Sequence, residues 1–193
     1  MKKSFLKFFG NKSEAFTLVE VLISVFIVIL LTTMVLVNFE WGGYNFALER
    51  SLRAISQQIR LVQEMALSSK EIEGAVPPGG YGIHFAKTDL QKYILFADYK
   101  NTEEKLRTYG LEDQIIGEYS LERDISIEDL CESYACEQDF LDIVFVPPDP
   151  EVYINGFPSP GGSDFFAKIF LVSVNKATGS IAINGAGLVE VQK

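Results

Sequence analysis

The sequence predicts an α+β protein in which one long N-terminal helix packs on an antiparallel β-sheet domain. Three observations along the chain support this fold class. Residues 16–37 form an apolar run with one charge, residues 44–72 carry an amphipathic helical pattern, and the rest holds short β-rich segments separated by turns. The first half of the helix is therefore expected in a membrane and the second half on the sheet.

Composition is consistent with one compact domain plus an additional element. The chain has 193 residues, 48% of them apolar, and a net charge of −9. Residues 1–15 contain four lysines and one acid, which leaves 13 basic and 25 acidic residues for the remainder. An acidic body argues against sequence-independent nucleic-acid binding, which requires Lys and Arg to displace counterions. Nucleic acid is therefore not an expected partner.

The apolar run reads FTLVEVLISVFIVILLTTMVLV, and Glu20 is its only charged residue. A helix that crosses the hydrocarbon layer needs about 20 apolar residues. In lipid the backbone must be hydrogen-bonded internally, so a helix is expected despite the many β-branched residues. Because lysines precede the run, the positive-inside rule places residues 1–15 in the cytoplasm and the body outside. The sequence thus predicts a single-pass protein of the cytoplasmic (inner) membrane.

A cleavable secretory signal and a plain signal anchor are the alternatives for this run. A secretory signal has about 7–15 apolar residues and a small-x-small cleavage site, and residues 32–41 offer no such site. A plain anchor would be the default by hydropathy alone. Glu20 argues against it, because a carboxylate inside a membrane span is costly and is usually functional. The simpler reading is that Glu20 lies near the interface and reaches water.

Glu20 lies four residues after Phe16, so the two residues share a helix face about one turn apart. A cut just before Phe16 would create an α-amine close to Glu20, in the same chain or in a neighbouring one. Residues 12–24, KSEAFTLVEVLIS, resemble the signal of type IV prepilins and type II secretion pseudopilins. That family motif is a basic leader, a small residue and F-T-L-[IV]-E-[VL]-L-[IV]. The chain departs from it at Ala15, where the family usually has glycine.

The resemblance implies cleavage by prepilin peptidase after Ala15, N-methylation of Phe16 and retention of the apolar helix. It also implies that Glu20 pairs with the N-terminal amine of a neighbouring subunit during assembly. The implied function is a minor pilin or pseudopilin with the pilin fold, a structural subunit of a type IV pilus-like or type II secretion filament outside the cytoplasm. The implied partners are prepilin peptidase, other pilin or pseudopilin subunits, an inner-membrane assembly platform and the lipid membrane.

The second helical segment is amphipathic. Apolar residues recur at steps of three and four, namely Leu48, Leu52, Ile55, Ile59, Val62 and Ala66. This stripe is expected to pack on the sheet, although a free coiled coil has a similar pattern. Gly42 and Gly43 weaken the helix between the two halves and predict a kink there. The segment EGAVPPGG, residues 73–80, is expected to end the helix.

The remainder of the chain is enriched in Val, Ile, Phe and Tyr at a regular spacing, which is typical of short strands. The predicted strands are residues 81–86, 93–97, 115–121, 126–130, 142–146, 151–154, 168–174 and 180–184. Residues 175–179, NKATG, predict a hairpin turn. The predicted regions are therefore a leader (1–15), a membrane and filament-core helix (16–43), an amphipathic helix (44–72) and an exported β-rich domain (73–193).

The first predicted hairpin has a second, shorter resemblance. Residues 77–85, PPGGYGIHF, together with residues 93–98, YILFAD, resemble the first hairpin of H-type minor pseudopilins and related fimbrial assembly proteins. This resemblance implies a minor subunit within the same family.

Cys131 and Cys136 are the only cysteines, in C-x4-C spacing. They are expected to form a short disulfide loop if the domain is exported, or to remain free thiols in a reducing compartment. A metal site is not expected, because His84 is the only histidine and there is no second Cys pair. No cofactor is predicted.

Catalytic chemistry is poorly supported. There is no G-x-S-x-G pattern, and a single His84 in a strand is expected to be structural or at the surface. The acids of residues 122–129 are either a Ca²⁺ site or a solvated strand edge, and the edge is preferred. The sequence therefore does not predict an enzyme. The alternative to a filament subunit is a signal-anchored exported binding domain or enzyme.

Overall fold

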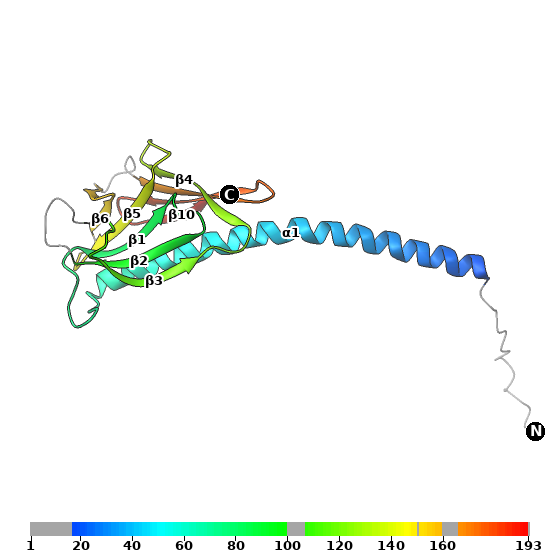
Figure 1. The fold of residues 1–193 in the computed structure, drawn as a ribbon, viewed down its shortest axis with the longest axis horizontal. Coiled ribbons are helices and arrows are strands. Elements are labelled where there is room, and N and C mark those ends of the chain that lie inside the picture. Colours follow the sequence, from blue (N-terminus) through cyan, green and yellow to red (C-terminus); the bar gives the residue numbers. More distant parts are fainter. Residues whose placement is uncertain (1–16, 100–106, 150, 160–165, 193) are drawn as a thin grey trace, which may run out of the picture. The chain divides into compact units, whose positions relative to one another are not determined.

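The computed structural model describes residues 17–99, 107–149, 151–159 and 166–192 (Figure 1). Its described elements are one helix and two antiparallel sheets, which confirms the predicted α+β class. The chain divides into two compact units, Met1–Glu40 and Trp41–Lys193. Helix α1 (Leu18–Leu67) contributes residues to both units. The strands all lie in the second unit.

Helix α1 begins directly after Thr17. The Oγ1 and the carbonyl of Thr17 both accept the backbone N–H of Glu20, at 3.3 Å and 3.0 Å, which is the arrangement of a helix N-cap. The backbone is helical through Gly42 and Gly43, so the pair does not end the helix. Two glycines inside a helix each cost about 1 kcal/mol relative to alanine, which is small beside the burial of the apolar stripe in the second half of this helix.

The helix ends at Leu67, before the predicted terminus at residue 72. The N–H of Lys70 bonds to the carbonyl of Met65, and the N–H of Ser69 bonds to the carbonyl of Ala66. Ser69 has a positive φ of 45°. This pair of bonds around a left-handed residue is a Schellman motif, which satisfies the last carbonyls and stops the helix. Ser69 takes the position that glycine usually fills.

The predicted apolar stripe of the second helix half is buried, which confirms that it packs on the sheets. Leu52, Ile55, Ile59 and Val62 have no exposed surface, and Leu48 is 5% exposed. These side chains share one core with the inner faces of both sheets. Burial of a complete large apolar side chain contributes about 1.5–3 kcal/mol, so this stripe is a main source of the stability of the second unit.

Six strands form the larger sheet, in the order β3-β2-β1-β5-β6-β7 (Figure 1). Their bounds are β1 (Gly80–Ala86), β2 (Lys92–Asp98), β3 (Gln114–Ser120), β5 (Phe140–Val146), β6 (Glu151–Ile154) and β7 (Phe157–Pro158). Neighbouring strands are antiparallel. β5 lies between β1 and β6, so a polar residue on β5 is surrounded by strands on both sides.

Four strands form the second sheet, in the order β10-β9-β8-β4. Their bounds are β4 (Ile125–Glu132), β8 (Phe166–Ser173), β9 (Thr178–Asn184) and β10 (Val189–Gln192). The expectation of one sheet was therefore wrong: β4 leaves the order of the first sheet and pairs with β8. All eight predicted strands are present with ends shifted by a few residues at most, whereas β7 and β10 were not predicted. The predicted turn at residues 175–179 joins β8 to β9.

A smaller apolar cluster lies on the outer face of the six-stranded sheet. Phe96, Val144 and Tyr153 are buried there, and Tyr109 packs against them. The segment that carries Tyr109 follows the undescribed residues 100–106 and precedes β3. This segment covers part of the sheet. Its backbone lies against the strands, where it can hydrogen-bond to buried polar residues.

Candidate functional site

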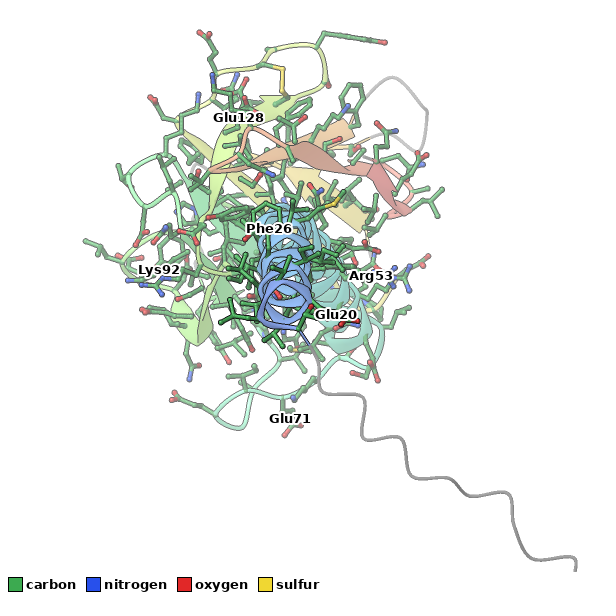
Figure 2. All side chains as sticks on the ribbon, turned by 90° about the vertical axis from the view of Figure 1, so that its right-hand side faces the viewer. Glu20, Phe26, Arg53, Glu71, Lys92 and Glu128 are labelled. Atoms are coloured by element: carbon green, nitrogen blue, oxygen red, sulfur yellow. A yellow bond between two sulfur atoms is a disulfide. The ribbon has the colours of Figure 1, made fainter. Side chains whose placement is uncertain are left out.

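The N-terminal part of α1 is long and apolar enough to span a membrane over Leu18–Leu36. Its large apolar side chains are exposed all round the helix, from 51% for Val21 to 80% for Leu18. Figure 2 shows the side chain of Phe26 projecting from this helix, and Phe26 is 62% exposed. A continuous apolar surface of this extent is unusual on a water-soluble monomer, and it marks a surface that contacts lipid or protein.

The hydroxyl groups inside this segment are hydrogen-bonded within the helix. Ser24 Oγ donates to the carbonyl of Glu20 at 2.8 Å, and Thr32 and Thr33 donate to the carbonyls four residues earlier at 2.7 Å. An unsatisfied polar group in an apolar medium costs several kcal/mol, so these bonds make the three side chains compatible with lipid. The carboxylate of Glu20 is then the one charged group of the segment.

Glu20 lies in the first turn of α1, where a negative charge interacts favourably with the helix dipole. Its side chain is exposed (Figure 2). Within the described part of the chain its carboxylate has no hydrogen bond or ion pair. Ala15 and Phe16, the residues of the predicted cleavage and N-methylation, lie outside the described residues. The predicted partner of Glu20 is the processed amine of Phe16 in another subunit, and that pairing stays a prediction.

In the second unit, polar contacts join α1 to the segment between β3 and β4. The guanidinium of Arg50 makes two hydrogen bonds to the carboxylate of Glu122, at 3.0 Å and 3.1 Å. The hydrogen bond and the charge of Arg50 hold the pKa of Glu122 below its usual value, against a smaller opposing effect of burial. The N–H of Glu122 also donates to Ser51 Oγ at 3.2 Å. These contacts connect the helix to the segment that precedes β4.

A disulfide joins Cys131, near the end of β4, to Cys136, and it appears as a yellow bond in Figure 2. The loop between them contains a backbone bridge between Glu132 and Ala135. The N–H of Ser133 donates to the carbonyl of Phe166 on β8 at 2.6 Å, which attaches the loop to the second sheet. The structure thus brings the two predicted cysteines together in a well-bonded corner.

The carboxylate of Asp129 supports the same corner. Its Oδ1 accepts hydrogen bonds from the N–H of Leu130 at 2.9 Å and of Glu137 at 3.0 Å, and Lys87 Nζ lies 3.0 Å away. Burial raises the pKa of Asp129, but the hydrogen bonds from Lys87, Leu130 and Glu137 outweigh it and lower the pKa below its ordinary value. Asp129 therefore stays ionised, and it is paired with a lysine.

His84 has a buried partner that the sequence did not reveal. Its Nδ1 lies 2.6 Å from Oδ1 of Asp142, whose side chain is 1% exposed. The ring of His84 packs against the ring of Tyr109, with centroids 4.6 Å apart. Within the described residues no Ser, Thr or Cys side chain hydrogen-bonds to His84. An aspartate within the apolar strand FLDIVFV was the available signal for this pair.

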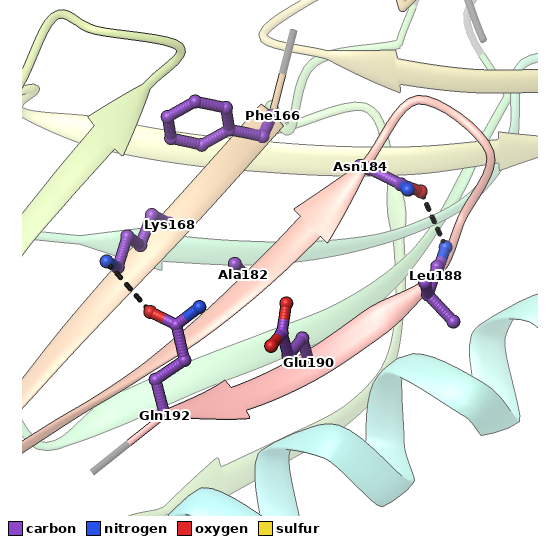
Figure 3. Close-up of a pocket in the computed structure, with 7 residues that line it drawn as sticks. All are labelled: Phe166, Lys168, Ala182, Asn184, Leu188, Glu190 and Gln192. Carbon is purple, nitrogen blue, oxygen red and sulfur yellow. Dashed lines mark hydrogen bonds between the residues drawn. The ribbon is translucent and has the colours of Figure 1, made fainter. Parts of the chain in front are cut away.

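A shallow groove of about 320 Å³ lies on the outer face of the second sheet (Figure 3). Its walls combine apolar side chains with one base and one acid, and are formed by Phe166, Lys168, Ala182, Asn184, Leu188, Glu190 and Gln192. Lys168 Nζ donates to Gln192 Oε1 at 3.3 Å, and the N–H of Leu188 donates to Asn184 Oδ1 at 2.9 Å. The polar groups of the groove are thus partly paired with one another.

No protein family, curated protein or solved structure matches the chain. Any inference of function therefore rests on the chain's own residues. The features that carry it are the exposed apolar helix segment, the single carboxylate in that segment and the folded β-rich unit that follows.

Proposed function

We propose that this chain is a structural subunit, a minor pilin or pseudopilin, of a type IV pilus-like or type II secretion filament. The observation that supports the proposal most directly is the exposed apolar segment Leu18–Leu36, which holds one carboxylate at Glu20. Glu20 lies four residues after the junction of Ala15 and Phe16, where the sequence resembles a prepilin cleavage site. The resemblance of residues 77–85 to H-type minor pseudopilins favours a minor subunit.

In the proposed mechanism the chain first inserts as a single-pass membrane protein, with its lysine-rich leader in the cytoplasm. Prepilin peptidase then cuts after Ala15, and the new amine of Phe16 is methylated and stays positively charged. In the membrane this amine pairs with Glu20 of a neighbouring subunit, which offsets the desolvation of both charges. The pairing also fixes the axial offset between neighbours, because apolar helices alone can slide past each other.

After assembly the apolar helix segments exchange lipid contacts for contacts with one another. Association of helices in lipid depends on close packing and on polar pairs, since lipid tails are as apolar as leucine. The β-rich unit is carried outside the membrane, and its acidic surface keeps it soluble. The proposed roles require no catalytic residue and no cofactor in this chain.

The mature N-terminus tests this proposal. Mass spectrometry of protein extracted from membranes should identify methylated Phe16 as the first residue. Ala15→Gly should be cleaved at least as well, because it restores the residue usual in the family, and Ala15→Leu should block the cut. An intact Met1 in cells with active prepilin peptidase, or a cut after residue 37, would show that the proposal is wrong.

The second candidate is a signal-anchored exported binding domain that never enters a filament. The groove of Figure 3 is the observation in its favour, because it combines Phe166 with the polar side chains of Lys168 and Glu190. The two candidates differ in processing: only a filament subunit requires the cut before Phe16. The same mass-spectrometric measurement therefore separates them.

A further inference from the structure

Within the second unit, helix α1 and the turn between β8 and β9 lie side by side. A groove of about 190 Å³ runs between them. Its walls come from both elements and are formed by Asn45, Phe46, Leu48, Glu49, Leu52, Ala177 and Thr178. The approach is close, because a Cβ atom placed on Gly179 would lie 2.7 Å from Cδ1 of Leu52. The helix and the turn therefore present one continuous surface.

Two large apolar side chains on this surface are exposed. Phe46 on α1 is 64% exposed, and Val174 in the turn is 69% exposed. The turn is well bonded: the N–H of Val174 donates to the carbonyl of Asp124 at 3.1 Å, and the N–H of Ala177 donates to Ser173 Oγ at 3.1 Å. A side chain presented on a rigid turn loses little conformational freedom when a partner covers it, which favours binding.

The charge of this surface differs from that of the chain as a whole. Three segments border the surface, namely residues 45–53, 121–124 and 173–178. Together they carry four bases and three acids, whereas the chain after its leader carries 13 bases and 25 acids. Arg50 and Arg53 are paired with acids of the same segments. Arg123 and Lys176 are exposed, and neither forms an ion pair with another described residue.

We propose that this surface, hereafter the docking surface, binds the anionic phospholipid headgroups of the membrane that holds the apolar segment. The inference rests on the proposed insertion of Leu18–Leu36 in that membrane. The span ends at Leu36, ten residues before Phe46, so even a fully extended chain keeps Phe46 within about 35 Å of the end of the span. Such a tether raises the effective concentration of lipid, so a contact that is weak by itself is sufficient.

Apolar side chains and bases have separate roles in the docked state. Phe46 and Val174 enter the interfacial layer, where buried apolar area contributes to binding. Arg123 and Lys176 contact the lipid phosphates, whose negative surface potential attracts them. A bilayer is within reach of every inserted chain, whereas a second subunit must first be encountered. Lipid is therefore the occupant of the docking surface before assembly.

The test uses the full-length chain in vesicles of phosphatidylcholine, alone or mixed with phosphatidylglycerol. A trace phospholipid carries a photoactivatable group in its headgroup, and peptide mass spectrometry locates the lipid that becomes attached. Residues 45–53 and 173–178 should be labelled, and more strongly with phosphatidylglycerol. Tyr134, which is 81% exposed in the disulfide loop and belongs to none of the three segments, is the internal control. Labelling of Tyr134 equal to that of Val174, or labelling independent of phosphatidylglycerol, would overturn the proposal.

Matched variants separate the two contributions. Arg123→Gln and Lys176→Gln should each lower the ratio of labelled to unlabelled turn by about fivefold in vesicles with phosphatidylglycerol. Lys70→Gln removes the same charge from an exposed position outside the three segments and should change the ratio by less than about twofold. Val174→Asp should abolish labelling of the turn. Equal ratios for Lys176→Gln and Lys70→Gln would contradict the role of the bases.

A second trace lipid, with its reactive group in the acyl chain, reports insertion separately. Labelling of Leu18–Leu36 by this lipid without labelling of the docking surface by the first would overturn the docking inference and leave the proposed function intact. Absence of label from Leu18–Leu36 would overturn both. Labelling of the turn that decreases as the ratio of protein to lipid is raised is expected only if a second copy covers the docking surface better than lipid does, and it would likewise overturn the inference.

Discussion

The carboxylate of Asp142 on β5 lies 2.6 Å from Nδ1 of His84 on β1, and the two residues are partners in the antiparallel register. The second oxygen of Asp142 accepts the N–H of Tyr109 at 3.0 Å, and the N–H of Asp142 donates to Asn155. One buried carboxylate therefore joins two strands of the six-stranded sheet to the segment that covers its outer face. Removing a buried polar group that has several hydrogen-bond partners is costly, because each partner is left unsatisfied.

Asp142→Ala should lower the free energy of unfolding by about 1–3 kcal/mol for each group left without a hydrogen bond, because His84 Nδ1 and the N–H of Tyr109 both lose their partner. Asp142→Asn should cost less, since an amide oxygen can still accept one of these bonds. Chemical denaturation of the purified protein measures both. Asp139→Ala is the control at an exposed position three residues away, and it should change stability by no more than about 0.5 kcal/mol. Equal effects of Asp142→Ala and Asp139→Ala would contradict the prediction.

The disulfide between Cys131 and Cys136 should be present in protein collected from the cell envelope. Non-reducing peptide mapping should recover the two cysteines in one linked peptide. In the chain-entropy description, closing so short a loop contributes about 2–3 kcal/mol, so a reductant should lower the stability by that amount. Recovery of two alkylatable thiols from the envelope fraction would contradict the prediction.

Asp129→Asn should destabilise the oxidised protein in a pH-dependent way. The folded-state pKa of Asp129 is lowered, so its contribution is fully present above the ordinary carboxyl value near about 4 and is lost as the pH falls through the folded-state value. The variant should be about 1–2 kcal/mol less stable at pH 7, because three donors lose a charged acceptor. The difference from wild type should shrink as the pH falls below about 4, as denaturation curves measured at successively lower pH would show. A difference that stays constant to low pH would refute the role of the charge.

Glu20→Ala should insert, be cleaved and carry a folded β-rich unit, yet enter filaments poorly. Without the carboxylate, the proposed amine of a neighbouring Phe16 is left unpaired in an apolar environment, at a cost of about 3–5 kcal/mol by analogy with buried pairs in soluble proteins. Glu20→Gln tests the charge alone, since it preserves the shape of the side chain. Expression beside the partner subunits, followed by comparison of sheared filaments with membranes, measures incorporation.

Glu64→Ala is the control for this experiment, because Glu64 is an exposed acid of the same helix beyond the apolar segment. It should enter filaments at the wild-type level. Incorporation of Glu20→Ala equal to that of Glu64→Ala would reject the assembly role. A subunit at the filament tip has only one axial neighbour, so a smaller defect is expected if this chain occupies that position.

The elements that could be predicted from the sequence are those whose repeating apolar pattern covers several helix turns or several strand residues. The stripe from Leu48 to Ala66 was identified from spacing alone, because burial on one face requires that spacing. The end of α1 was not predicted correctly. The Schellman motif there uses Ser69, and a serine in the left-handed conformation has no distinctive sequence signal. β7 has two residues including Pro158, which is too short a pattern to recognise. β10 (VEVQ) has four residues, as β6 (EVYI) does, but it lacks the Tyr and Ile that marked β6 as a strand.

Strand partners could not be predicted in the same way. The division into two sheets depends on the pairing of β4 with β8, whose residues are some forty positions apart, as in the pair Leu130 and Ile169. The contact of His84 with Asp142 likewise joins residues 58 positions apart. Such contacts depend on the order of the strands in the fold. The composition and spacing within a single segment do not determine that order. The cysteine pair was accessible because its separation is only five residues.

The hydroxyls of Ser24, Thr32 and Thr33 are turned back onto their own helix. In the proposed membrane setting, no face of the segment beyond its first turn is then more polar than another. Rotation of the helix about its long axis should be nearly free of energetic preference in a lipid bilayer before assembly. The helix would take up a fixed rotation about its long axis only when Glu20 binds a neighbouring subunit. A single side chain would therefore set this rotation for every helix that enters the filament. Spectroscopic probes placed around the segment should accordingly report uniform lipid exposure in the unassembled pool and distinct environments after assembly.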